Sequence, residues 1–223
     1  MTPESFFAIT GYRFNRIELL EQALTHRSYS RNNNNERLEF LGDSILNLII
    51  SRFIYDALAD ASEGDLSRIR ASLVKEETLA IVAMEIGLGD HIFLGGGELK
   101  SGGFRRASIL ADGLEAVIAS VCLDSDLQQA ERVVLKLFHQ HLQNLPDGAS
   151  LRDPKTKLQE KLQAQKMELP VYEVTQTCGK SHNQTFTVSC SIAGLKLETN
   201  GSGTSRKKAE QQAAVKMLKQ LRQ

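Results

Sequence analysis

Apolar residues recur at three- and four-residue spacing through most of the first 145 residues. This spacing places them on one face of an α-helix. It predicts helices over residues 16–29, 35–58, 62–87, 105–124 and 127–145. Ser62, three residues before Asp65, is typical of a residue that caps a helix N-terminus. The first part of the chain is therefore expected to be all-α.

The pattern changes after a segment rich in turn-forming residues, which contains Pro146, Gly148 and Pro154. Helical spacing returns over residues 155–166, and apolar and polar residues then alternate, as in β-strands, over 170–177, 184–192 and 195–201. A last helix is expected over 205–222. We predict an α-β-β-β-α domain of the α+β class, with both helices on one face of the sheet. The predicted boundaries are a domain over 1–145, a linker over 146–153 and a domain over 154–223.

Composition limits the class of protein. The chain has 223 residues, 41% hydrophobic and 24% charged, which is typical of soluble globular proteins. No apolar run approaches the roughly 18 residues of a membrane span. The first residues lack a basic leader followed by an apolar stretch, so no secretory signal is expected. The three cysteines lack CxxC spacing, and we expect free thiols in a reducing compartment such as the cytoplasm.

The net charge of zero hides two halves of opposite sign. Residues 1–145 contain 14 Lys and Arg against 20 Asp and Glu, a charge of −6. Residues 146–223 contain 13 against 7, a charge of +6. This division suggests that the basic half faces a polyanion, although chance asymmetry of a solvated surface would give the same totals.

Acidic residues form a stripe on the second predicted helix. At about 100° per residue, Glu36, Glu39, Asp43 and Asn47 fall within an arc of roughly 80°. No Lys or Arg stands at the neighbouring helical positions that would pair with them. Like charges at this spacing repel one another. The stripe therefore faces either a cation or water.

A second acidic pair, Asp112 and Glu115, shares one face of the helix over 105–124. If the two helices pack together, these acids can converge with Glu39 and Asp43. Four carboxylates provide the oxygen ligands that Mg²⁺ prefers. A metal held in this way can activate water for attack on a phosphodiester. The alternative is that each helix has a solvated acidic face.

Phe40 projects near the acidic stripe, as does Ile50, away from the leucine-rich side. A helix that is apolar on nearly all sides is usually buried. Phe40 therefore indicates either a dimer interface beside the acids or burial under another helix of the same domain.

The segment NERLEFLGDSIL resembles the signature of the bacterial ribonuclease III family. The segment GGGELKSGGFRRASILADGLEAVIASVCLD is similar to a second conserved block of that family, and EGDLSRIRASLVKEETLA fits the pattern between them. GKSHNQTF and GTSRKKAEQQAA resemble parts of a double-stranded-RNA-binding domain. The resemblance covers essentially the whole chain, in the family's domain order. It implies an all-α endonuclease domain followed by a small RNA-binding domain.

The resemblance also implies roles for single residues. Glu39, Asp43, Asp112 and Glu115 match the family's Mg²⁺-binding carboxylates, with Asp43 and Glu115 the most critical for catalysis. Glu36 and Glu63 match accessory acids, although Glu63 also fits a first-turn acid at a helix N-terminus. Phe40 matches an aromatic residue of the family's dimer interface. Gln159, His182, Arg206, Lys207 and Lys208 are the expected RNA contacts.

Glu210 departs from the pattern, because many such domains have a third basic residue at its position. It puts the strength of phosphate binding by this domain alone in doubt. The glycine-rich stretch over 95–103 lacks the GxxxxGK[ST] arrangement of a phosphate loop. We expect a mobile loop there, with Lys100, Arg105 and Arg106 available for phosphates.

The sequence therefore predicts a Mg²⁺-dependent homodimeric endoribonuclease, with Mn²⁺ as a substitute. The family resemblance implies that it cuts double-stranded RNA to 5′-phosphate and 3′-hydroxyl ends and processes ribosomal RNA precursors and structured messenger RNAs in the cytoplasm. No membrane and no small-molecule substrate is expected. A rival is a non-catalytic RNA-binding regulator whose helical domain only dimerises. Such a protein would not need the four carboxylates.

Overall fold

The computed structural model describes residues 3–146, 148, 151–179 and 184–221. The chain divides into two compact units, Met1–Ala149 and Ser150–Gln223. Each unit is described by itself. None of the helices that the structure describes combines the length and apolar character needed to span a membrane.

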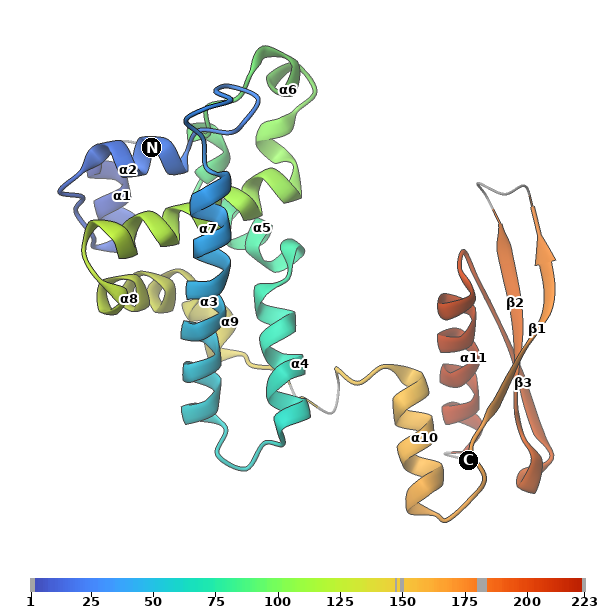
Figure 1. Ribbon diagram of the computed structural model, residues 1–223. Coiled ribbons are helices and arrows are strands. Elements are labelled where there is room, and N and C mark those ends of the chain that lie inside the picture. The colour runs from blue at the N-terminus through green and yellow to red at the C-terminus, as the bar shows by residue number, and fades with distance from the viewer. Residues whose placement is uncertain (1–2, 147, 149–150, 180–183, 222–223) are drawn as a thin grey trace. The chain divides into compact units, whose positions relative to one another are not determined.

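The first unit is helical, as the spacing of apolar residues predicts. Its longest helices are α3 and α7, which cross in Figure 1. In order, the α-helices are α1 (Pro3–Thr10), α2 (Ile17–Ala23), α3 (Glu36–Ala57), α4 (Glu63–Val74), α5 (Glu76–Glu85), α6 (Gly96–Lys100), α7 (Ala107–Asp124), α8 (Leu127–Leu137) and α9 (His139–Gln143).

Helix α7 lies at the centre of this unit. It packs against α2, α3, α5 and α8, and its side chains from Ala116 to Val121 are all buried. A helix that is apolar on nearly every side is stable only when other helices surround it. The acids Asp112 and Glu115 interrupt this apolar surface on the side that faces α3.

Four sequence predictions for this unit are wrong, and one of them is the single helix expected over 127–145, which Phe138 divides into α8 and α9. The helix expected over 16–29 ends at Ala23, because the following backbone pairs with another segment: the amide of Phe93 donates to Leu24 and the amide of His26 donates to Phe93. The helix expected over 62–87 is two helices, since Lys75 has an extended backbone with ψ of 152°. The stretch over 95–103 contains the short helix α6 instead of a continuous loop.

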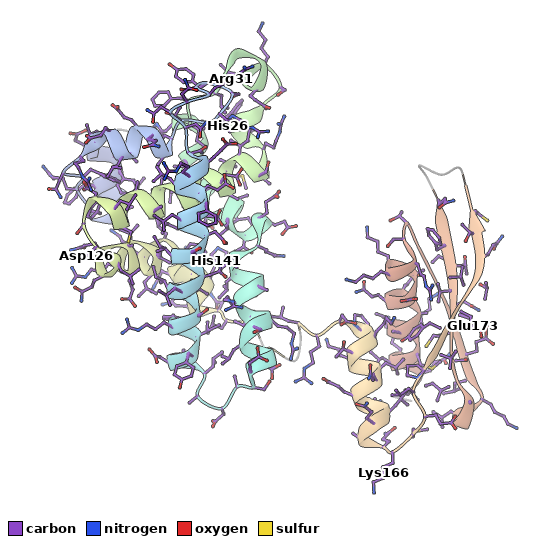
Figure 2. All side chains as sticks on the ribbon, viewed as in Figure 1. His26, Arg31, Asp126, His141, Lys166 and Glu173 are labelled. Carbon is purple, nitrogen blue, oxygen red and sulfur yellow. The ribbon has the colours of Figure 1, made fainter. Side chains whose placement is uncertain are left out.

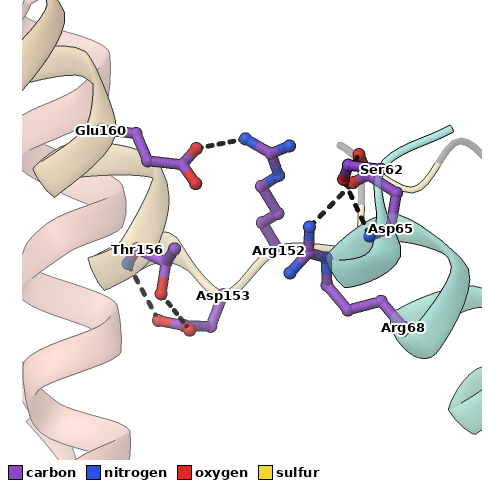
Figure 3. Close-up of polar contacts among 7 residues, drawn as sticks. All are labelled: Ser62, Asp65, Arg68, Arg152, Asp153, Thr156 and Glu160. Carbon is purple, nitrogen blue, oxygen red and sulfur yellow. Dashed lines mark hydrogen bonds and ion pairs between the residues drawn. The ribbon is translucent and has the colours of Figure 1, made fainter.

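The predicted cap of α4 is confirmed. The hydroxyl of Ser62 accepts a hydrogen bond from the amide of Asp65 at 3.2 Å (Figure 3). Arg68, one turn further along, donates to the Asp65 carboxylate at 2.8 Å. The first turn of α4 is therefore held by side chains as well as by its own backbone bonds.

The second unit has the predicted α-β-β-β-α order, with both helices packed on the sheet or on each other. Its three antiparallel strands lie in the order β1-β2-β3 (Figure 1). Cys190 and Ile192 of β2 point into a core with Leu158 and Leu162, and Val188 of the same strand is also buried. The elements are α10 (Pro154–Ala164), β1 (Val171–Cys178), β2 (Thr185–Ile192), β3 (Leu197–Gly203) and α11 (Arg206–Gln220).

Polar contacts fix the start of α10. The Asp153 carboxylate accepts bonds from the amide and the hydroxyl of Thr156, at 3.1 and 2.6 Å (Figure 3). Pro154 at the first helical position needs no donor partner, so the sequence Asp-Pro starts the helix cleanly. Arg152, just before the helix, pairs with Glu160, eight positions further along the chain.

Strand β1 is an edge strand with an irregularity. Its register with β2 shifts between Val174 and Gln176, so one residue bulges out of the ladder. Apart from the partly buried Tyr172, the side chains of β1 are exposed. At β3, Gly201 is required because a Cβ there would lie 2.2 Å from the Ala209 carbonyl oxygen of α11.

Candidate active site and RNA-binding surface

The two acid-bearing helices meet at a glycine. A Cβ on Gly42 of α3 would lie 1.9 Å from the carbonyl oxygen of Glu115 on α7, where no side chain can fit. Glycine therefore lets the two backbones touch at this point. Because Gly42 directly precedes Asp43, the contact brings the acidic faces of both helices together.

Three of the four predicted carboxylates form one group. Glu39, Asp112 and Glu115 each offer an oxygen atom, and these atoms lie within 4.8 Å of one another. All three side chains are partly buried. Oxygen ligands gathered over such a distance suit a hard divalent cation such as Mg²⁺ or Ca²⁺.

The electrostatics of this group also fit a cation. Burial, followed by the charges of Asp43, Asp112 and Glu39, raises the pKa of Glu115 to about 8. Burial and the charge of Asp112 raise the pKa of Glu39, and burial and the charge of Glu76 raise that of Asp112. A bound cation would relieve this repulsion and keep the three acids ionised.

Asp43 lies beside the group without belonging to it. Its Oδ1 accepts a hydrogen bond of 2.8 Å from the Asn47 amide, one turn along α3. It is nevertheless close enough to be the strongest charged influence on Glu115. The assignment of Asp43 as a fourth ligand stays a prediction.

The remaining predicted residues of the first unit lie on its surface. Glu36 pairs with Arg27 at 3.3 Å. Glu63 is exposed in the first turn of α4 and accepts a hydrogen bond from Ser67. Phe40 is 78% exposed, so no helix of its own unit buries it, whereas Ile50 is fully buried.

Four of the five predicted RNA contacts are exposed in the second unit. Arg206, Lys207 and Lys208 form the first turn of α11, whose N-cap Ser205 accepts from the amide of Lys208. Basic side chains at a helix N-terminus, where the helix dipole is positive, suit phosphate binding. Gln159 is exposed on α10. His182 lies outside the described residues.

Glu210 is not a free charge facing the RNA. It is 9% exposed, and its carboxylate accepts from Lys155 at 2.6 Å and from Arg206 Nε at 2.9 Å. Burial raises the pKa of Glu210, but the bonds from Lys155 and Arg206 outweigh burial and hold it below the ordinary value. The acid therefore holds the Arg206 side chain through its Nε.

Sequence reasoning missed two features of the first unit. Arg27 pairs with Glu36 from a loop, so the search for partners along the helix could not find it. The close contact at Gly42 also could not be predicted from the spacing of apolar residues, because a single glycine inside a helix does not change that spacing. Its position beside Asp43 was the only available sign.

Family comparisons cover both units. A family described as ribonuclease-III-like matches residues 16–142, and the double-stranded RNA binding motif matches residues 154–221. Ribonuclease 3 of Vibrio cholerae is 54% identical over 211 residues, which are 95% of this chain and 93% of that protein. Ribonuclease 3 of Shewanella denitrificans is 55% identical over 208 residues, 93% of this chain and 92% of that protein.

A solved structure agrees with the helical unit. The nuclease domain of ribonuclease III from Campylobacter jejuni, described with a flexible region involved in dimer formation, is 39% identical. It matches with a TM-score of 0.61 and covers 62% of this chain and 97% of that structure. Together with the acidic group between α3 and α7, these matches place the chain in the ribonuclease III family of double-strand-specific endoribonucleases.

Proposed function

We propose that the chain is a Mg²⁺-dependent nuclease that cuts both strands of duplex RNA and leaves 5′-phosphate and 3′-hydroxyl ends. The observation that carries this proposal is the group of Glu39 on α3 and Asp112 and Glu115 on α7, whose carboxylate oxygens lie within 4.8 Å of one another. Mn²⁺, which accepts the same oxygen ligands, would substitute for Mg²⁺.

The acids of the group have separate tasks in this proposal. Glu39, Asp112 and Glu115 would hold the ion, and Asp43 would join them or orient water from beside Glu115. A bound divalent cation supplies an activated water and neutralises charge on the phosphodiester. Because burial favours the protonated form of Glu115, its carboxyl must give up a proton before it can act as a ligand.

We further propose a homodimer in which Phe40 enters the second copy. An apolar cavity of about 660 Å³ opens beside Phe40, lined mainly by Leu19, Leu38, Leu41 and Leu123. Burying a phenylalanine side chain contributes up to about 3 kcal/mol. A two-fold interface would make this contact twice. The Campylobacter jejuni nuclease domain, which is described as having a region involved in dimer formation, supports the dimer itself.

The second unit would hold the duplex. Double-stranded RNA is recognised largely by its phosphates and 2′-hydroxyls over about 16 base pairs. Arg206, Lys207 and Lys208 would contact phosphates, while Gln159 and His182 would reach successive minor grooves. We assign residues 1–145 to the nuclease domain and 154–223 to this RNA-binding domain, joined by 146–153. Its substrates would be ribosomal RNA precursors and structured messenger RNAs of the cytoplasm.

The test uses a labelled RNA duplex with Mg²⁺ or with a chelator. The native chain should cut only with the metal, and Glu115→Gln should bind the duplex without cutting it. Glu131→Gln, an acid of α8 outside the group, is the matched control and should cut normally. If Glu115→Gln and the native chain cut equally well, the assignment of Glu115 fails.

A rival function is RNA binding without catalysis. The partly buried acids argue against it, because a protein that only binds RNA gains nothing from a group of mutually repelling carboxylates beside its polyanionic ligand. Binding without any metal-dependent cutting by the native chain would favour the rival.

A further inference from the structure

A cavity of about 310 Å³ adjoins the acidic group. One wall contains Glu39 and Asp112, two members of that group. The other walls come from the loop before α3, from α6 and from the start of α7. Figure 2 labels His26 in this loop, near the first turn of α3. The volume is at the lower end of small-ligand sites, which are roughly 300–1,000 Å³.

Hydrogen-bond donors without partners face this cavity. Asn35 lines it and is 2% exposed, and within the described part of the chain its Nδ2 has no hydrogen-bond partner. A buried unpaired amide donor is costly unless a ligand or water satisfies it. Asn35 is held in place by its own amide, which donates to the Thr25 carbonyl at 2.9 Å.

The start of α7 adds further donors. Ser108 and Ile109 line the cavity, and no side chain of Arg106, the N-cap residue, closes the end of the helix. The first backbone N–H groups of a helix lack partners within the helix, and its dipole is positive there. An 18-residue helix therefore presents its positive end to the cavity.

Two arginines flank the same space. Arg27 pairs with Glu36 at 3.3 Å, and Arg106 pairs with Glu98 at 2.8 Å. Their side chains are 70% and 47% exposed, so both can turn toward a ligand without disturbing the core. Glu39 and Asp112 would be offset by a bound cation. Glu36 and Glu98 also line the cavity, and each is offset by the arginine that it pairs with. An anion that draws the two guanidinium groups inward would also meet the Asn35 amide and the N-terminus of α7.

We propose that this cavity binds one backbone phosphate of the RNA strand being cut, adjacent to the scissile phosphodiester, through Arg27, Arg106 and the Asn35 amide. The inference rests on the proposed nuclease function, because Glu39 and Asp112 in one wall of the cavity belong to the acidic group where that function places the cut. Arg27 and Arg106 are positioning residues here. They fix the strand relative to the metal-binding acids without touching the bond that breaks.

The test is a double-mutant cycle between protein and RNA. Duplexes carry a single uncharged methylphosphonate at each phosphate around the cut, one position at a time. Single-turnover cleavage is measured for the native chain, for Arg27→Ala, Arg106→Ala and both together, and for Arg52→Ala. Arg52 is a matched control, because it forms an exposed ion pair with Glu131 away from the cavity.

Arg27→Ala and Arg106→Ala should each cut about 10- to 100-fold more slowly, as expected for a lost charge-assisted contact, whereas Arg52→Ala should cut like the native chain. One methylphosphonate next to the cut should slow the native chain and Arg52→Ala by a similar factor. The same methylphosphonate should change the rate of the double variant by less than about twofold, because the contact is already gone. Arg27→Lys should restore part of the rate, since it keeps the charge and loses the planar donors.

The inference would be overturned if the effects of the arginine substitutions and of the methylphosphonate on the cleavage rate were independent of each other. If the methylphosphonate slows the double variant as much as the native chain at every position, the cavity does not hold an RNA phosphate. Inhibition by inorganic phosphate at constant ionic strength that is lost in the double variant, without a methylphosphonate effect, would assign the cavity to free phosphate instead. These results are distinct from failure of the nuclease function, which would appear as metal-independent cutting or as equal cutting by Glu115→Gln.

Discussion

Replacing Gly42 with alanine tests whether the contact between α3 and α7 builds the active site. On helix propensity alone, alanine in a helix interior is better than glycine by about 1 kcal/mol. The structure predicts the opposite sign. The new Cβ would lie 1.9 Å from the Glu115 carbonyl oxygen and 2.4 Å from its carbonyl carbon. Ordinary contact begins near 3.4 Å, so the backbones must separate by about 1.5 Å.

Backbone atoms cannot rotate away from this clash as the end of a side chain can. Overpacking of this kind costs about 1–3 kcal/mol or more, which for a unit of this size lowers the melting temperature by several degrees. The separation also moves Glu39 away from Asp112 and Glu115. A misplacement of about 1 Å can lower a catalytic rate by about 100-fold. We therefore expect Gly42→Ala to lose both stability and metal-dependent cutting.

Gly113→Ala is the matched control on α7, one residue after Asp112. Its Cβ would lie 3.1 Å from Ile92 Cδ1, the movable end of a side chain. This variant should melt and cut close to the native chain, because the isoleucine can shift by a few tenths of an ångström. Thermal unfolding and cleavage of a labelled duplex measure both variants. A Gly42→Ala protein as stable and active as Gly113→Ala would refute the close approach as the basis of the site.

Three further predictions concern charge and assembly. Without metal, the pKa of Glu115 in the folded chain is raised to about 8. Between about pH 4.5 and pH 8 the folded chain therefore keeps a proton that the unfolded chain has lost. The free energy of unfolding should thus fall as pH rises through this range. In chelator, Glu115→Gln should thus melt higher than the native chain at pH 9, with the difference shrinking by pH 5; a lower melting point at pH 9 would contradict this. Phe40→Asp should shift the chain toward monomer in sedimentation, and an unchanged dimer would remove Phe40 from the interface. Lys207→Ala should weaken duplex binding and lower the slope of log affinity against log salt by about 1. Lys219→Ala, at the far end of α11, should leave both affinity and slope unchanged. Equal slopes for the two variants would exclude the phosphate contact of Lys207.

The sequence predicted the parts of the site that lie on regular helices. Asp112 and Glu115 lie on one face of α7, and Glu39 lies on the acidic face of α3. Their convergence could be predicted because the opposite face of each helix is apolar and must be buried. The break at Lys75 could not be found in this way, because the apolar residues on both sides continue the same period. The cavity next to the acids also escaped prediction. Arg27 and Asn35 enter it from a loop that is placed by the pairing of Thr25 with Phe93, a contact between segments far apart in the chain.

In the second unit the order of helices and strands could be predicted from the change between helical spacing and strand-like alternation. The burial and pairing of Glu210 could not. From the sequence alone, an acid next to the basic residues 206–208 indicates weakened phosphate binding. Lys155 lies 55 positions away and reaches the same carboxylate from α10. Only the packing of two helices reveals that Glu210 is a counter-ion within the fold.

The bulge in β1 has a consequence for behaviour in crowded conditions. Long RNA duplexes would gather many copies of the chain at high local concentration, where a straight, open strand edge invites intermolecular β-pairing and aggregation. The shifted register between Val174 and Gln176 interrupts the regular row of donors and acceptors along that edge. The bulge therefore disfavours sheet-to-sheet pairing between neighbouring copies on one duplex.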